Sequence, residues 1–231
     1  MPQNTWVLIS LNETTVKLYW STGSDLLRTV LIRLMGLPEL DSFRLVGGTA
    51  LALQLGHRIS NDLDMFTDKE YGVVDLKKID SLLRKNFNYV DKGTTDNFQI
   101  GIMRLIGDSP EHSIKVDLFY TDTFVRPPII EEGIRLASVE EIAAMKLELI
   151  ARGGRKKDFW DLIEILDHYS LPQLFEIYAE RYPYLDLAYL QTCLTNFLIA
   201  DEQEDPVCLK GRIWELVKLD IEDILGKYHK I

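Results

Sequence analysis

The sequence predicts an α+β protein in which a mixed sheet flanked by helices is followed by a C-terminal helical half. Before about residue 130, stretches with the two-residue period of strands alternate with stretches that have the period of helices. After Pro127-Pro128, the remaining patterns are helical. We therefore expect a mixed domain with an N-terminal helix over residues 1–130 and a helical domain over residues 131–231.

Length and composition are those of an ordinary globular protein. The chain has 231 residues, of which 46% are hydrophobic and 27% charged, and this excludes a disordered or fibrous class. Its net charge of −10 argues against non-specific binding to duplex DNA. No apolar run approaches the roughly 18 residues that span a bilayer, and no secretory signal is recognisable. With two cysteines that match no metal spacing, these features predict a cytoplasmic protein without membrane contact.

The elements of the mixed half follow from periodicity and turn residues. The first 20 residues carry no firm period and are interpreted as an irregular or loosely paired arm. Helices are expected over residues 24–35, 49–55 and 73–85. Strands are expected over residues 43–46, 62–66, 87–90, 98–106 and 113–120, with Gly107-Asp108-Ser109-Pro110 as the turn between the last two.

The helical half begins with a recognisable N-terminal signal. Ser138-Val139-Glu140-Glu141 is typical of a capping box and opens a helix over residues 139–151. Gly153-Gly154 end that helix. Further helices are expected over residues 157–168, 172–181, 185–200 and 211–225.

A double glycine between a strand and a helix is the first candidate binding site. Strand 43–46 leads into Gly47-Gly48-Thr49, where the helix begins. Free N–H groups and the positive end of the helix dipole attract an anion there, and glycine lets a phosphate approach the backbone. The Thr49 hydroxyl adds a donor. A double glycine before a helix is also a common turn, so the pattern alone leaves both interpretations open.

Three acidic residues form the second candidate site. Asp62 and Asp64 are two residues apart in a strand and therefore point to the same face. Close carboxylates repel one another unless they share a cation, and hard oxygen ligands suit Mg²⁺. Asp117 lies in another alternating strand, with Lys115 on its face. If the two strands are neighbours, the three acids could hold two metal ions. The alternative is an exposed strand face with solvated acids.

Charged residues of the helical half form the third candidate group. Lys146 lies within an apolar stretch of its helix, so it either buries its stem or directs its ammonium at a phosphate. Asp158 and Asp161 begin the next helix, where they could simply stabilise the helix dipole. The basic run Arg155-Lys156-Lys157 could be a solvated loop, or the loop Arg152–Lys157 that contains it could grip RNA locally.

Taken together, these motifs resemble the AbiEii/AbiGii-type toxin family of the DNA polymerase β-like nucleotidyltransferase superfamily. The similarity covers about residues 26–168 and includes Gly-Gly-Thr, Arg-x-Ser-x-Asp-x-Asp, a later strand Asp, Ala-x-Lys-Leu and Lys-Asp-x-x-Asp-Leu. The region beyond residue 170 has no recognisable motif. The matching residues are Gly47, Gly48, Thr49, Arg58, Ser60, Asp62, Asp64, Asp117, Lys146 and Asp158, with Asp161 as a nearby match.

The resemblance implies a nucleotidyltransferase-like fold and Mg²⁺-dependent transfer of a nucleoside monophosphate from an NTP, with two Mg²⁺ ions. It implies that the catalytic residues are Asp62, Asp64, Asp117, Lys146 and Asp158. Of these, Asp62, Asp64 and Asp117 are implied to bind the metal. Nucleotide binding is implied for Gly47, Gly48, Thr49, Arg58, Ser60 and Lys146. Because some members of the family are toxins that modify tRNA, an RNA acceptor such as tRNA and a cognate antitoxin protein are expected partners.

Two other function classes fit parts of the sequence. A non-catalytic nucleotide-binding or antitoxin-partner module would bind NTP without turnover, but it would have no need of all three aspartates. A metal-dependent phosphodiesterase would more naturally use His-Asp ligand pairs. The four histidines form no such motif: they are His57, His112, His168 and His229.

Overall fold

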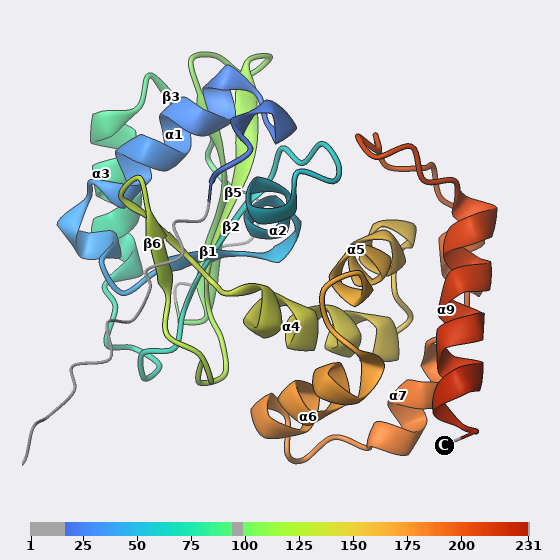
Figure 1. Cartoon of the computed structure of the whole chain (residues 1–231). Coiled ribbons are helices and arrows are strands. Elements are labelled where there is room, and N and C mark those ends of the chain that lie inside the picture. Colours follow the sequence, from blue (N-terminus) through green and yellow to red (C-terminus); the bar gives the residue numbers. More distant parts are fainter. Residues whose placement is uncertain (1–16, 94–98, 231) are drawn as a thin grey trace, which may run out of the picture.

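The computed structural model describes residues 17–93 and 99–230 and has an α+β architecture, which confirms the predicted fold class (Figure 1). A seven-stranded mixed sheet has the order β3-β4-β5-β2-β1-β7-β6. Its strands are β1 (Arg44–Val46), β2 (Leu63–Thr67), β3 (Tyr89–Val90), β4 (Gly101–Gly107), β5 (Ser113–Tyr120), β6 (Ile129–Glu131) and β7 (Ile134–Leu136).

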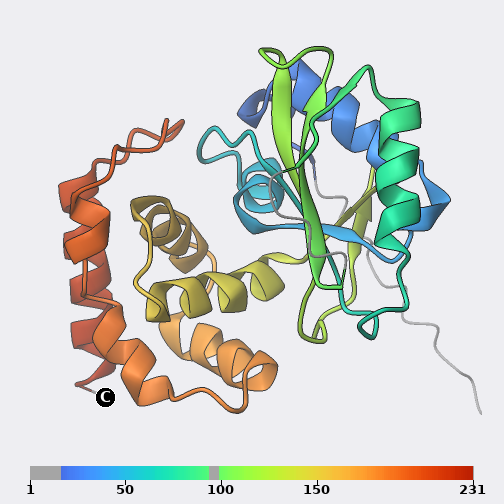
Figure 2. The same ribbon diagram turned by 180° about the vertical axis from the view of Figure 1, so that it is seen from behind.

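Helices cover both faces of the sheet and form the C-terminal half of the described chain. They are α1 (Asp25–Met35), α2 (Gly47–Leu55), α3 (Leu76–Asn86), α4 (Val139–Ala151), α5 (Lys156–Leu166), α6 (Leu171–Arg181), α7 (Leu187–Cys193), α8 (Leu198–Asp201) and α9 (Trp214–Tyr228). Helices α1 and α3 lie on one side of the sheet, and α2 lies on the other side, towards α4 (Figure 2). Within the described ranges, no helix combines the length and the apolar character needed to cross a membrane.

The register of the sheet brings the acidic strands together. Strand β2 runs parallel to β5 and places Asp64 opposite Asp117. On its other side β2 is antiparallel to β1, with Asp64 opposite Val46. Leu63 and Met65 are buried while Asp64 is only partly exposed, as the two-residue period predicts. The expectation that these two strands are neighbours is confirmed.

A β-hairpin after residue 127 was not predicted. Strands β6 and β7 pair with each other, and β7 joins the sheet beside β1, with Leu136 opposite Leu45. Each of these strands has three residues, which is too short for a two-residue period to be recognised. The sheet therefore continues beyond the boundary expected after residue 130, and the division into two domains stays a prediction.

Most other predicted elements are present with shifted ends. The helix expected over residues 185–200 is wrong: it is interrupted between α7 and α8. There the Asn196 side chain accepts a hydrogen bond from Leu198 N, and such local bonds compete with a helix. At the start of α4, the Ser138 side chain accepts from Glu141 N as predicted, but the Glu141 carboxylate accepts from Val125 N and Arg126 N and does not complete a capping box. Most of the expected N-terminal arm, residues 1–16, and the first residue of the strand expected over 98–106 lie outside the described residues.

The C-terminal segment returns to the sheet half just before α9. The backbone N–H of Ile59 donates to the carbonyl oxygen of Val207 at 2.9 Å, and Leu209 N donates to His57 O at 2.8 Å. Arg58 and Cys208 thereby form an antiparallel bridge. The region beyond residue 170, which has no recognisable motif, thus fixes the loop before β2 through these backbone hydrogen bonds.

Candidate active site

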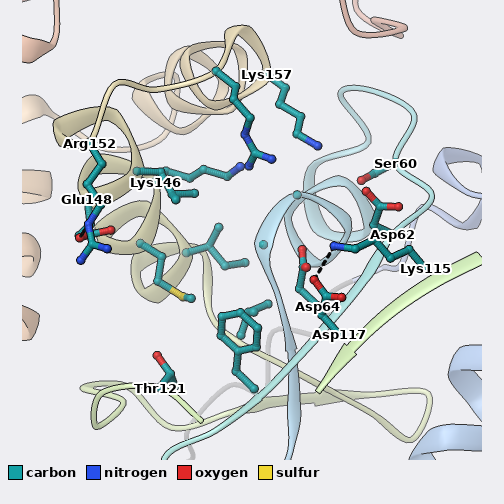
Figure 3. Close-up of a pocket in the computed structure, with 18 of the residues that line it drawn as sticks. Ser60, Asp62, Asp64, Lys115, Asp117, Thr121, Lys146, Glu148, Arg152 and Lys157 are labelled. Carbon is teal, nitrogen blue, oxygen red and sulfur yellow. Dashed lines mark hydrogen bonds and ion pairs between the residues drawn. The ribbon is translucent and has the colours of Figure 1, made fainter. Parts of the chain in front are cut away.

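A pocket of about 370 Å³ lies between the sheet and helices α4 and α5 (Figure 3). Both kinds of charge line the pocket: most of the acids come from the sheet half, and most of the cations come from the helical half. Of the ten predicted site residues, all but Thr49 and Asp158 line this pocket. Those that do are Gly47, Gly48, Arg58, Ser60, Asp62, Asp64, Asp117 and Lys146.

The acidic wall is centred on Asp64 and Asp117, which face the pocket from adjacent strands. Burial raises the pKa of Asp64, and the neighbouring charge of Asp117 raises it further. Lys115 Nζ lies 2.6 Å from Asp117 Oδ2. Burial lowers the pKa of Lys115, but Asp117, Asp64 and Asp62 outweigh that effect and the pKa is raised. The acids therefore lie in a region of concentrated negative charge.

These residues fit a divalent cation. The other carboxylate oxygen of Asp117, Oδ1, is buried and has no hydrogen-bond partner among the described residues. A buried carboxylate oxygen without a donor is costly, and a cation would satisfy it. Asp62 is exposed immediately before β2. In the described part of the chain no three His, Cys, Asp or Glu side chains are already gathered around one point, so Asp62 would have to turn inward.

The glycine turn passes tightly between an acid and a cation. Gly47 has a φ of +68°, which favours glycine, and a Cβ at this position would collide with the Asp64 carboxylate. A Cβ on Gly48 would collide with Nη2 of Arg58. Both glycines therefore lie where a side chain cannot fit, and their backbone is open to the pocket.

Replacing Gly48 should test this close approach. Gly48→Ala is expected to reduce the free energy of unfolding by about 1–3 kcal/mol and to weaken NTP binding, because Arg58 is held by other partners and cannot move freely. Urea unfolding and NTP titration would measure both effects. Gly226→Ala in α9 is the matched control, since nothing lies within 4 Å of its Cβ. Equal stability of the two variants would contradict the prediction.

Thr49 has a different place from the one predicted. It is 2% exposed and does not line the pocket. Its hydroxyl donates to the carbonyl oxygen of Asp62 at 2.5 Å and lies 2.8 Å from the Ser60 hydroxyl. Thr49 therefore holds the segment before β2 in place, and its expected contact with phosphate is not available in this structure.

Asp161 is the centre of a buried ion network. Its carboxylate lies 2.8 Å from His57 Nε2, 2.6 Å from Arg58 Nε and 2.6 Å from Lys146 Nζ. Burial raises the pKa of Asp161, but Lys146 and Arg58 outweigh it and hold the pKa well below its usual value. Because His57 and Arg58 precede β2 while Lys146 belongs to α4, this one carboxylate joins the two walls of the pocket.

Lys146 is a buried, ion-paired lysine. Its Nζ also lies 2.7 Å from Asp158 Oδ1, and the side chain of Lys146 is 3% exposed. Asp158 in turn accepts from Arg155 N at 3.1 Å at the start of α5. Burial raises the pKa of Asp158, but Lys146 and Arg155 outweigh it and the pKa is lowered. Asp158 thus lies behind Lys146 rather than in the pocket wall.

The basic run at the start of α5 is divided between two environments. Arg155 and Lys157 line the pocket. Lys156 is 5% exposed, and its Nζ binds Asp205 at 2.9 Å and lies over the ring of Trp214. Lys156 is therefore not available for the local RNA contact that was considered for this run, because successive residues of a helix point in different directions.

Several residues of the pocket and of the ion network behind it were missed or undervalued in the sequence. Lys115 was placed on the face of Asp117 but given no role, and Asp161 was only a nearby match. His57 gave no signal, because its pairing with Asp161 spans 104 positions of the chain. Glu148 and Arg152 also line the pocket as an ion pair one helical turn apart, a spacing that is common on solvated helix faces.

A family model and a protein from another organism match most of this chain. A family model described as "Nucleotidyl transferase AbiEii toxin, Type IV TA system" matches residues 30–204. An uncharacterized protein of Aquifex aeolicus (strain VF5) is 31% identical over 188 residues, which are 76% of this chain and 84% of that protein.

Solved structures with low sequence identity show the same fold. A protein of H. pylori that is assigned to the nucleotidyltransferases has a TM-score of 0.58 at 20% identity, covering 89% of this chain and 92% of that one. The nucleotidyltransferase toxin MenT4 of Mycobacterium tuberculosis H37Rv has a TM-score of 0.51 at 13% identity, covering 87% and 83%. An antigenic nucleotidyltransferase-like protein of Paracoccidioides brasiliensis has a TM-score of 0.51 at 20% identity, covering 88% and 93%.

The family match spans most of the chain and includes the glycine turn, the acids of β2 and β5, and the buried cations opposite them. It confirms the resemblance drawn from the motifs. The chain is a nucleotidyltransferase and belongs to the AbiEii nucleotidyltransferase toxin family of type IV toxin–antitoxin systems.

Proposed function

We propose that this protein transfers a nucleoside monophosphate from an NTP to an RNA acceptor, with tRNA as the first candidate, in a Mg²⁺-dependent reaction, and that it acts as the toxin of a toxin–antitoxin system. The observation that carries the proposal is the placement of Asp64 opposite Asp117, beside the glycine turn and across the pocket from a wall of cations. We further propose a cytoplasmic location and a cognate antitoxin protein as partner.

The acidic wall would hold the metal. Asp64 and Asp117 would be its main ligands, with Asp62 as the third carboxylate. When bound, Mg²⁺ would neutralise charge on the triphosphate and make the acceptor hydroxyl more acidic. Asp117 is also the chain's own candidate to accept the proton of that hydroxyl, through the carboxylate oxygen that does not hold the metal.

The glycine turn and the opposite wall would hold the triphosphate. Backbone N–H groups at Gly47 and Gly48 begin helix α2 and can donate to phosphate oxygens. Arg155 and Lys157 approach the same pocket from α5 and would stabilise the negative charge that collects on the leaving pyrophosphate. Lys146, held by Asp158 and Asp161, adds a fixed positive charge in the pocket wall.

The proposal is tested by incubating the protein with each labelled NTP, Mg²⁺ and total cellular RNA. Label in RNA together with released pyrophosphate is the expected result, and Asp117→Asn should abolish both. NTP binding without pyrophosphate release would instead identify a non-catalytic nucleotide-binding module. Pyrophosphate release with label in protein would replace the RNA acceptor by a protein acceptor.

The two residues of the basic run that line the pocket, Arg155 and Lys157, should also contribute to RNA binding. Replacing Arg155 and Lys157 together by Gln is expected to weaken RNA modification and to lower the log–log salt slope of RNA binding by about 0.7 for each lost phosphate contact. Filter binding at several salt concentrations would measure the slope. Lys156→Gln is the matched control, because Lys156 belongs to the same run but binds Asp205. An equal effect of both changes would contradict a local RNA contact.

A further inference from the structure

Lys115 occupies part of the acidic wall. It lies two residues before Asp117 on the same face of β5, and its Nζ is 2.6 Å from Asp117 Oδ2. The Lys115 side chain is 38% exposed, whereas that of Asp117 is 16% exposed. Figure 3 shows this ion pair at the edge of the pocket, directly beside Asp64. The ammonium therefore has room to leave towards solvent, while the carboxylate has not.

The position of Lys115 has a physical reason. Asp64 and Asp117 are opposite each other in register on adjacent strands, so their carboxylates would repel without a nearby cation. Lys146 on the opposite wall forms its ion pairs with Asp158 and Asp161, and it forms none with Asp64 or Asp117. In the ligand-free protein, Lys115 supplies the compensating charge at Asp117.

A divalent cation at this wall would need the same carboxylate. One oxygen of Asp117 is without a hydrogen-bond partner among the described residues, and the other is taken by Lys115. A metal ion and an ammonium on one carboxylate repel each other, so the binding of one disfavours the other. Such a coupling is reciprocal, and typical couplings change an affinity by about 5- to 150-fold.

We propose that Lys115 is a displaceable counter-ion, which neutralises Asp117 while no divalent cation is bound and competes with that cation for the carboxylate. This inference rests on the proposed metal-dependent function. It adds that the protein itself sets its metal affinity through Lys115, keeping the acids assembled without metal at the expense of weaker metal binding.

The test is a titration of the whole chain with Mn²⁺ in the absence of nucleotide. Calorimetry measures the Mn²⁺ affinity, and thermal unfolding measures the stability with and without Mn²⁺. Lys115→Gln is expected to bind Mn²⁺ at least about fivefold more tightly than the wild type. The same variant should melt at a lower temperature in EDTA, because Asp64 and Asp117 then lack their counter-ion, and should gain more from added Mn²⁺. A purely structural ion pair would give the lower melting temperature without the tighter binding.

Two further variants separate contact from general charge. Lys115→Arg keeps a cation beside Asp117 and should retain an affinity close to that of the wild type. Lys157→Gln removes one positive charge from the same pocket without an ion pair to these acids, and it should change the affinity clearly less than Lys115→Gln. An unchanged or weaker Mn²⁺ affinity of Lys115→Gln, or an equal gain in Lys157→Gln, would overturn the inference.

The experiment also distinguishes this inference from the proposed function. If the wild type transfers nucleotide but Lys115→Gln binds Mn²⁺ no more tightly, the counter-ion role fails and the function stands. If Lys115→Gln binds Mn²⁺ more tightly while the wild type transfers nothing to any acceptor, the counter-ion role stands and the function fails. If no Mn²⁺ binds to either protein, both are wrong.

Discussion

Asp64→Asn should abolish nucleotide transfer and at the same time raise the melting temperature in EDTA. The loss of activity is expected to reach about a thousandfold or more, because metal binding contributes several kcal/mol to phosphoryl-group chemistry. The gain in stability follows from the pKa of Asp64, which burial and then Asp117 raise. A carboxyl whose pKa is raised by folding lowers stability at neutral pH, where it is ionised. Removing that charge relieves the cost.

Two measurements on the same samples test this prediction. Transfer is followed with labelled NTP, and melting is followed in EDTA and in Mg²⁺, where the wild type should gain stability and Asp64→Asn should not. Asp108→Asn is the control, since Asp108 lies on an exposed turn of the same sheet with its side chain 59% exposed. A variant that melts earlier in EDTA, or one that keeps its activity, would contradict the assignment of Asp64.

Asp161→Asn is expected to cost about 3–5 kcal/mol of the free energy of unfolding, the usual effect of breaking a buried ion pair from one side. The carboxylate is fully buried, and its loss would leave Arg58 facing an amide and Lys146 with Asp158 as its remaining carboxylate. Activity should fall as well, because both cations belong to the pocket wall. Urea unfolding at pH 7 measures the change in the free energy of unfolding.

The pH dependence of this variant provides a second criterion. Folding lowers the pKa of Asp161 well below its usual value of 3.8. The ionised Asp161 therefore contributes to the free energy of unfolding above about pH 4, and this contribution is lost as the pH falls further. The difference between wild type and Asp161→Asn should therefore shrink in acid. The control is Asp223→Asn, whose partner Lys227 lies 2.6 Å away on the exposed face of α9, and this change should cost clearly less than Asp161→Asn. A similar cost for both would show that the Asp161 network is not a major contributor to stability.

The sequence predicted the acidic wall well because its signal is local. The two-residue period of each strand predicts that its aspartate lies on the face opposite to its buried apolar residues. Only the pairing of the two strands, which places Asp64 opposite Asp117, had to be assumed. The glycine turn was equally accessible, since Gly47 and Gly48 lie at a strand–helix junction. For both features, a few consecutive residues contain the information.

The opposite wall was harder to predict because its contacts join distant segments. Thr49 looked like a phosphate donor from its position beside the glycines, but its hydroxyl is used by Asp62 and Ser60. Lys156 and Lys157 are equivalent in the sequence, and only the packing of α9 draws Lys156 away to Asp205. Asp161 could be read as a helix-start acid, and its three cationic or polar partners are visible only in the folded chain.

The bridge between Arg58 and Cys208 joins the loop before β2 to a segment that is synthesised 150 residues later. Domains fold from the N-terminus while the ribosome is still adding residues, so the sheet with its acids can form early. The loop of His57 and Ile59 gains its backbone partners only after Val207 and Leu209 have emerged. A nascent chain therefore displays the acidic wall before the cation network behind it is fixed. In a family of toxins, this order delays the assembled pocket until all of the matched region, residues 30–204, has been translated.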